Sequence, residues 1–179
     1  LKVLHDPAYR LHYDQALRSL LLVETRISKN PREGASLFEA LLKTAQLPSE
    51  DANTVNRWIS GLKAWSKATP LKDADKLLSG EKLITSGATR GIDFQRDDVA
   101  ILRGTALVHE ALESGTITPA QRRKALYLLG YAYTQVPQFF TEGWGEMYLE
   151  RCIDEFPNTQ ESKWAFTIYR DTVIDDFTG

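Results

Sequence analysis

The chain of 179 residues is predicted to fold as an all-α domain, with about eight helices packed in several layers. Apolar residues recur at three- and four-residue steps along most of the chain, which is the spacing that gives a helix one apolar side. No segment of useful length alternates apolar and polar residues as a half-buried strand does. Proline, glycine and capping residues interrupt the helical pattern, and these interruptions set the expected helix ends.

The composition excludes several classes of protein. Hydrophobic residues make up 42% and charged residues 26% of the chain, which is ordinary for a globular domain and too apolar for a disordered one. A formal net charge of −2 provides no basic field for a nucleic-acid backbone. Apolar runs such as residues 20–23 are far too short to span a membrane. The single cysteine, Cys152, excludes an internal disulfide and a multi-cysteine metal cage.

Four helices are predicted in the first half of the chain. The first spans residues 8–30, and its apolar stripe includes Val23 and Ile27. It ends at Pro31, because proline disfavours helical geometry in the residue before it. Gly80 weakens the fourth helix from within. The second, third and fourth helices are expected at 35–46, 48–67 and 73–86.

Helical periodicity fails between residues 85 and 98, and this is the longest predicted loop. We expect one domain over residues 1–179, with a possible subdomain boundary at 85–98 that separates N-terminal helices (1–84) from a second set (97–179). Thr118 followed by Pro119 is a clear helix start, with a hydroxyl cap and a proline at the first helical position. The helices of the second set are expected at 97–114, 118–136, 141–156 and 160–175.

Two features of this second set predict its packing. The helices at 99–113 and 125–136 are apolar nearly all round, so each needs neighbours on several sides. Helix starts recur about every twenty residues, so that helix pairs recur about every forty, which is the period of solenoids built from helical hairpins.

Residues 125–157 resemble a tetratricopeptide repeat. The first helix of that repeat carries Leu-Gly followed by a tyrosine, and the second carries a small, a large and a small residue before a terminal proline. The matching residues are Leu129, Gly130, Tyr133, Gly145, Leu149, Cys152 and Pro157. The turn between the helices is about three residues longer than in the family's repeat of about 34 residues, and Leu126 stands where a tryptophan is usual.

This resemblance implies antiparallel helix hairpins stacked as an α-α superhelix, whose first helices line a concave surface that binds a peptide or protein segment. Phe139, in the turn between the helices, is a further candidate contact. Two alternatives remain: Tyr127 and Tyr131 are buried against the preceding helix, and the turn aromatics pack as a hydrophobic staple. The candidate partner-binding residues on the concave side of the first helix are Lys124, Tyr127, Leu128, Tyr131, Thr134 and Gln135.

No complete catalytic motif accompanies this surface. His109 and Glu110 begin like a metalloprotease helix, but Glu113 stands where the second histidine is required, so a partly buried histidine is the simpler interpretation. Cys152 lies on an apolar helix side, which indicates core packing rather than a reactive thiol. The basic run 122–124 indicates a solvated helix side rather than a nucleic-acid patch. We therefore expect no enzyme activity, no cofactor and no metal.

The expected function is a protein–protein interaction scaffold that takes a protein or peptide partner and no nucleic acid. One alternative is a helical accessory domain of a larger enzyme or envelope assembly, and another is a helical small-ligand carrier. The chain starts at Leu1 and its only methionine is Met147, so we expect a processed product or a fragment of a longer protein. Residues 155–159 resemble repeat ends common in bacterial cell-envelope tetratricopeptide proteins, which favours the periplasm or cell envelope over the cytoplasm.

Overall fold

The computed structural model describes residue 4 and residues 6–88, 96–136 and 143–178, except the side chains of residues 7 and 173–178. These residues form eight α-helices and two short helical segments with no β-strand among them, so the predicted all-α class is confirmed. The short segments are the 3-10 helix η2 (Pro7–His12) and the π-helical turn η3 (Val23–Ile27). The α-helices are α1 (Tyr13–Leu22), α2 (Pro31–Thr44), α3 (Ser49–Ser66), α4 (Asp73–Ala88), α5 (Asp98–Glu113), α6 (Pro119–Gln135), α7 (Trp144–Glu155) and α8 (Gln160–Thr178).

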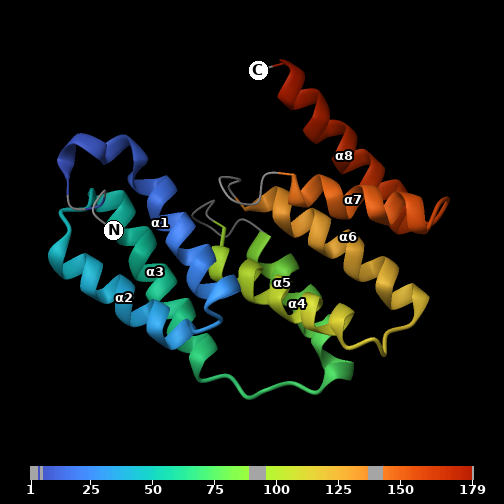
Figure 1. The fold of residues 1–179 in the computed structure, drawn as a ribbon, viewed down its shortest axis with the longest axis horizontal. Helices are drawn as coiled ribbons and strands as arrows, with labels where there is room; N and C mark the ends of the chain where they lie inside the picture. Colours follow the sequence, from blue (N-terminus) through green and yellow to red (C-terminus); the bar gives the residue numbers. More distant parts are fainter. Residues whose placement is uncertain (1–3, 5, 89–95, 137–142, 179) are drawn as a thin grey trace.

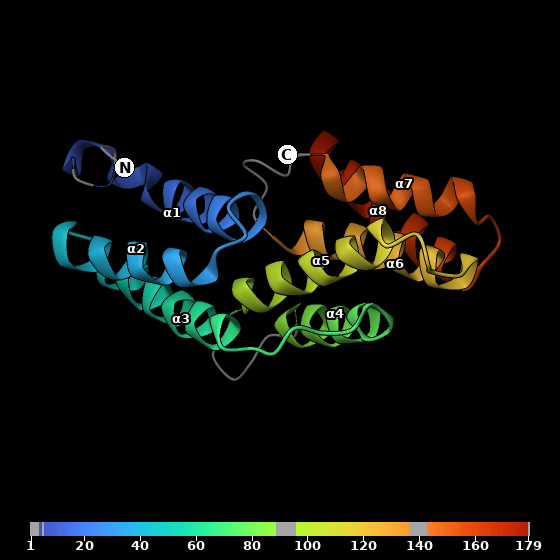
Figure 2. The same cartoon turned by 60° about the horizontal axis from the view of Figure 1, so that its bottom comes forward.

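Neighbouring helices pair as hairpins along the chain (Figures 1 and 2). α2 packs on α3, α4 on α5, α6 on α7, and α7 on α8. The N-terminal helices gather at one end of the molecule, α4 and α5 lie in the middle, and α6–α8 form the other end. α6 also contacts α4 and α8, so these alternate helices are neighbours, as in stacked helix hairpins. In the described part of the chain, no helix combines the length and the hydropathy that a membrane span needs.

The helix predicted over residues 8–30 is instead divided into η2, α1 and η3. In η3 the amide of Ser28 donates to the carbonyl oxygen of Val23, five residues back, at 2.9 Å, which widens the turn. A wider turn changes the direction in which the following side chains project. Val23 and Ile27, whose spacing predicts burial, are therefore 36% and 73% exposed, and Thr25 is buried instead.

α2 begins at Pro31, earlier than predicted. The side chain of Asn30 caps the helix by accepting a hydrogen bond from the amide of Glu33 at 3.2 Å. The proline that ends the preceding helix therefore also opens the next one. The start predicted at Thr118 is confirmed, because its hydroxyl accepts from the amide of Gln121 while the Gln121 side chain accepts from the Thr118 amide.

α4 runs to Ala88, through residues that the sequence predicts as loop. It continues because Gly87 lies against α5: its carbonyl oxygen accepts from the amide of Asp97 at 3.0 Å. The possible subdomain boundary at 85–98 falls at this connection, of which residues 89–95 lie outside the described residues. α7 begins at Trp144, and the earlier start predicted at 141 also lies outside them.

The α6–α7 hairpin closes through two glycines. A Cβ atom on Gly130 would lie only 2.6 Å from Leu149 Cγ, and one on Gly145 would lie 2.9 Å from the methyl group of Thr134. Any larger residue at either position would push the helices apart. The close approach of helix backbones predicted for Gly130 and Gly145 is therefore confirmed.

The α4–α5 hairpin closes in the same way, which the sequence does not predict. A Cβ atom on Gly104 would lie 2.8 Å from the carbonyl oxygen of Gly80, and one on Gly80 would lie 2.9 Å from the carbonyl oxygen of Gly104. Gly80 lowers the intrinsic helix propensity of α4, but it allows the two backbones to touch. Packing therefore outweighs propensity at this position.

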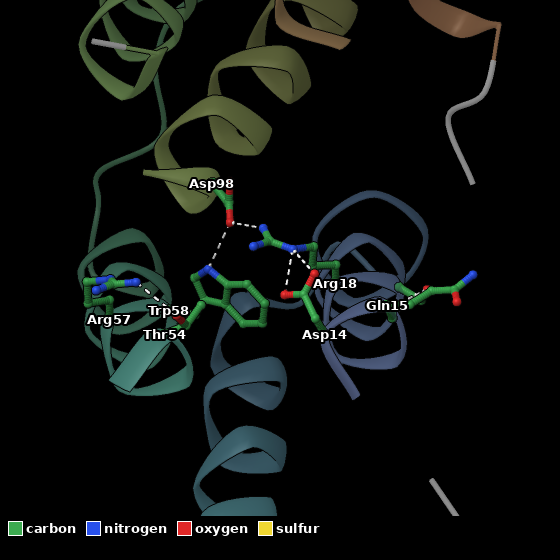
Figure 3. A network of polar contacts seen from close by, with 8 residues as sticks. Asp14, Gln15, Arg18, Thr54, Arg57, Trp58 and Asp98 are labelled. Atoms are coloured by element: carbon green, nitrogen blue, oxygen red, sulfur yellow. Dashed lines mark hydrogen bonds and ion pairs between the residues drawn. The ribbon is translucent and has the colours of Figure 1, made fainter. Parts of the chain in front are cut away.

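A buried polar network joins α5 to the N-terminal helices (Figure 3). Asp98, the first residue of α5, accepts hydrogen bonds from Arg18 Nη1 at 2.6 Å and from Trp58 Nε1 at 3.2 Å. The Arg18 guanidinium also lies 5.6 Å from the centroid of the Trp58 ring and pairs with Asp14 at 2.9 Å. The Asp98 side chain is only 8% exposed, so its charge depends on these donors. The network fixes α5 against α1 and α3.

Gly130→Ala is expected to lower the free energy of unfolding by about 1–3 kcal/mol in urea denaturation, because the new methyl group overlaps Leu149. This loss is net of the gain of about 1 kcal/mol in helix propensity. Combined with Leu149→Ala, the change should cost less than the sum of the two single changes, because the truncation removes the overlapping atoms. Strictly additive losses would show that Gly130 is not packed against Leu149.

Asp98→Asn is expected to lower the free energy of unfolding by about 3 kcal/mol, because Arg18 loses its buried counter-charge. The matched control is Asp14→Asn at the exposed end of the same network, for which we expect a loss of about 0–1 kcal/mol. Both values can be measured by urea denaturation followed by circular dichroism. Equal losses in the two variants would contradict the role assigned to Asp98.

Candidate functional site

An aromatic surface forms where α6 meets α8. Tyr127 and Tyr131, one turn apart on α6, stack with ring centroids 6.3 Å apart and planes inclined by 13°. The Trp164 ring of α8 lies 5.6 Å from the Tyr127 ring. Both tyrosines are half-buried against the core, and Trp164 is 49% exposed. We call Tyr127, Tyr131 and Trp164 the aromatic face.

A shallow pocket of about 260 Å³ opens on the aromatic face. Its walls are the rings of Tyr127 and Trp164 together with Thr167 and Ile168 of α8. The pocket is smaller than the usual site for a drug-sized ligand, and it can accept one apolar side chain. Burial raises the pKa of Tyr127 above its ordinary value of 10.0, so its hydroxyl remains a hydrogen-bond donor at neutral pH.

The basic residues at the start of α6 are bound to three other helices. Lys124, predicted as a contact residue, lies about one turn before Tyr127 and forms an ion pair with α4, which compensates its charge. The basic run therefore holds the helices together instead of forming a solvated side of α6 alone. The pairs are Lys124–Glu81 at 2.7 Å, Arg122–Glu155 at 2.7 Å and Arg123–Glu161 at 2.8 Å.

The remaining candidate residues are placed differently. Leu128 is buried in the core. The Thr134 methyl group lies against α7, and its hydroxyl donates to the carbonyl oxygen of Tyr131 at 2.8 Å. The Gln135 side-chain amide donates to the Thr134 hydroxyl at 3.4 Å. Phe139 lies outside the described residues. The structure therefore brings Tyr127, with Tyr131 stacked on it, next to α8, and it does not add the end of α6 to this group.

Trp164 and Ile168 are not among the residues predicted from the sequence. They lie one turn apart on α8, the same spacing as Tyr127 and Tyr131 on α6. That repeated spacing is the signal that could have indicated them. The spacing of Trp164 and Ile168 does not predict that they meet Tyr127, because the register of α8 against α6 depends on tertiary packing.

A second and more enclosed pocket, of about 160 Å³, lies between η3 and α5. Cationic side chains approach it from η3 and the residues after it, and carboxylates approach it from α5. We call it the η3–α5 pocket. Its charged and aromatic lining consists of Arg26, Lys29, Trp65, His109, Glu110 and Glu113.

His109 is partly buried at this pocket, as its simpler interpretation predicts. Its Nε2 lies 3.0 Å from the Tyr133 hydroxyl, and its ring meets the Tyr148 ring edge-on at 5.6 Å. Burial, and then the nearby cations Arg26 and Lys29, lower the pKa of His109 from 6.5 to about 4, so the imidazole is neutral at pH 7. Within the described ranges, no three histidine, cysteine or acidic side chains gather as a metal ion would require.

Cys152 is a core residue, which confirms its predicted role. It is fully buried beside Leu126, Leu149 and Ala165. Its thiol donates to the carbonyl oxygen of Arg123 over 3.7 Å. Burial raises the pKa of Cys152 from 9.0 to about 11, so the thiolate needed for nucleophilic chemistry is scarce at neutral pH.

The stability of the protein is expected to depend on the ionisation of His109. Its pKa is lower in the folded chain than in the unfolded chain, so the unfolded chain binds this proton more tightly and stability falls as the pH drops from 6.5 towards 4. At pH 5 the loss is at most about 2 kcal/mol.

Urea denaturation at pH 7 and pH 5 measures this loss. The control is His109→Gln, which removes the titrating group, so that its stability should change less between the two pH values than that of the wild type. The same change in both proteins would show that other groups carry the pH dependence.

Comparison of the chain with protein-family models, curated proteins and solved structures gave no match. What the chain can bind must therefore be inferred from its own surfaces. Among the described residues, the aromatic face and the η3–α5 pocket combine exposed or unpaired groups with an open volume.

Proposed function

We propose that this chain is a non-enzymatic interaction module that holds a peptide segment of a partner protein on the aromatic face. The single observation that carries the proposal is the open pocket beside Trp164, whose large ring is half exposed to water. Aromatic side chains around a pocket of this kind are typical of the residues that contribute most to protein–protein binding.

The walls of the pocket define the chemistry of the partner segment. Tyr127, Trp164 and Ile168 offer apolar surface, so the segment is expected to insert one large apolar side chain between α6 and α8. Burying such a side chain contributes about 1.5–3 kcal/mol. The Tyr127 hydroxyl has no hydrogen-bond partner among the described residues and can bond to the backbone of the segment, which favours a peptide over a small apolar molecule.

α4, which contacts α6, also carries an exposed apolar side chain. Leu78, which is 55% exposed, lies one turn before Glu81, and Glu81 pairs with Lys124 across the α4–α6 boundary. α6 contacts both α4 and α8. A segment several residues long could contact all three, which is how tetratricopeptide-like hairpins bind peptides according to the resemblance in residues 125–157.

Two parts of the proposal rest on the sequence alone. The first is that the chain carries no catalytic activity of its own, because its catalytic motifs are incomplete. The second is a location in the periplasm or cell envelope, which rests on residues 155–159 and stays a prediction. Neither affects the choice of the aromatic face.

The proposal can be tested by selecting peptides from a random phage-displayed library on the immobilised protein and measuring the affinity of an enriched peptide by fluorescence anisotropy. Trp164→Ala is expected to weaken binding about tenfold or more, because it removes one wall of the pocket. Tyr127→Ala should have a similar effect for the same reason.

Phe166→Ala is the matched control, because Phe166 is also an exposed aromatic residue on α8, at 54%, but does not line the pocket. It should leave the affinity within about twofold of the wild type. Circular dichroism verifies that the helices remain intact in each variant. The proposal fails if no peptide is enriched, or if Phe166→Ala weakens binding as much as Trp164→Ala.

A further inference from the structure

The η3–α5 pocket holds opposite charges that are not paired with one another. Arg26 and Lys29 lie in and just after η3, whereas Glu110 and Glu113 lie one turn apart on α5. Within the described part of the chain, no ion pair of 4.0 Å or less joins either cation to either carboxylate, although all four line one cavity. The space between them is therefore bordered by positive charge from one segment and by negative charge from another.

The cationic side of the pocket comes from Arg26 and Lys29, which both line the cavity. Within the described residues, no carboxylate forms an ion pair with either side chain. Two cations without a counter-charge beside one cavity favour a carboxylate as the group that they bind.

The acidic side of the pocket is held in place by α5 and α4. Glu110 pairs with Lys76 at 2.8 Å, which fixes its position beside the cavity. Glu113, one turn further along α5, is exposed and has no ion-pair partner within the described residues. A simple anion attracted by Arg26 and Lys29 would meet these carboxylates at close range, whereas a ligand that also carries an ammonium group would be attracted by them.

The other lining residues limit the size and character of the ligand. Trp65, Pro31 and Ala106 give the pocket an apolar wall, and His109, held neutral, adds no further charge. The volume of about 160 Å³ is far below that of a drug-sized ligand site and suits a molecule of about ten heavy atoms or fewer. The ligand is thus small, doubly charged and partly apolar.

We infer that the η3–α5 pocket binds a free α-amino acid as its zwitterion. The carboxylate of the amino acid accepts hydrogen bonds from Arg26 and Lys29, its ammonium group donates to Glu110 and Glu113, and its side chain lies against Trp65. The η3–α5 pocket shares no lining residue with the aromatic face, so amino-acid binding can be tested independently of peptide binding.

The first test is thermal denaturation at pH 7 with each of the coded L-amino acids at about 10 mM. At least one is expected to raise the melting temperature by about 3 °C, the shift that a dissociation constant near 1 mM would give. That amino acid is then compared by isothermal titration calorimetry with its N-acetyl derivative, which lacks the ammonium group, and with its amide, which lacks the carboxylate. Each analogue is expected to bind about tenfold more weakly or worse.

The second test uses variants in the same calorimetric titration. Arg26→Gln and Glu113→Gln should each weaken binding of the amino acid about tenfold. The matched controls are Arg32→Gln and Asp154→Asn, which remove exposed charges outside the pocket and should leave the affinity within about twofold. Because Glu113 is exposed and has no ion-pair partner in the described part of the chain, Glu113→Gln keeps the test valid even if Arg26→Gln does not fold.

Three results would overturn the inference. One is the absence of any shift in melting temperature with all of the amino acids. Another is an N-acetyl derivative that binds as tightly as the amino acid, which would make the pocket a plain anion site. The third is a loss of affinity in the control variants that equals the loss in Arg26→Gln and Glu113→Gln.

Discussion

Direct contact between helix backbones at glycine sets the geometry of the two hairpins at the centre of the fold. Gly80 meets Gly104 between α4 and α5, and Gly130 meets Leu149 between α6 and α7. Helices that touch in this way leave no room for a large side chain at the glycines themselves. The aromatic residues of α6 make their contacts elsewhere: Tyr127 meets Trp164 of α8, whereas Tyr133 stacks on Tyr148 of α7 and meets His109 of α5. Tyr127 lines the pocket of the aromatic face, and His109 lines the η3–α5 pocket.

α5 is the element through which the N-terminal helices are attached to the rest of the fold, and two polar groups at this junction behave differently. Asp98 receives donors from Arg18 and Trp58, so its buried charge is satisfied within the protein. Arg26 lines the η3–α5 pocket, and within the described residues no carboxylate pairs with it. A satisfied buried charge contributes to the position of α5, whereas a cation without a counter-charge beside a cavity can gain one from a ligand. This contrast is why Asp98 is interpreted as structural and Arg26 as part of a site.

Local sequence signals predicted those parts of the fold that depend on neighbouring residues. The start of α6 follows from Thr118 and Pro119, because a capping residue acts on the helix end that it precedes. The contact between α6 and α7 follows from Gly130 and Gly145, because a glycine allows close approach at its own position. The π-helical turn η3 could not be predicted in this way, because Val23 and Ile27 continue a regular apolar stripe in the sequence.

The parts that were missed depend on contacts between distant segments. Gly80 lowers the helix propensity of α4, and only the position of Gly104 across the hairpin shows why a glycine stands there. Trp164 likewise becomes part of a site only through the register of α8 against α6. For the candidate site, the sequence therefore indicated Tyr127 and Tyr131 on one helix but not the tryptophan that forms a pocket with Tyr127.

The aromatic face differs from an ordinary core contact when it is compared with the other aromatic pairs of the same chain. Phe38 and Trp58 also lie 5.6 Å apart, yet their exposed fractions are 0% and 3%, so packing alone accounts for them. Tyr127 and Trp164 have the same centroid separation, but Trp164 keeps 49% of its surface in water. If this second pair served only to hold α8 on α6, the exposed half of the tryptophan would contribute nothing to stability. The exposed part of the ring also forms a wall of the pocket, and for this reason the proposed peptide site is assigned to this face rather than to the buried pair.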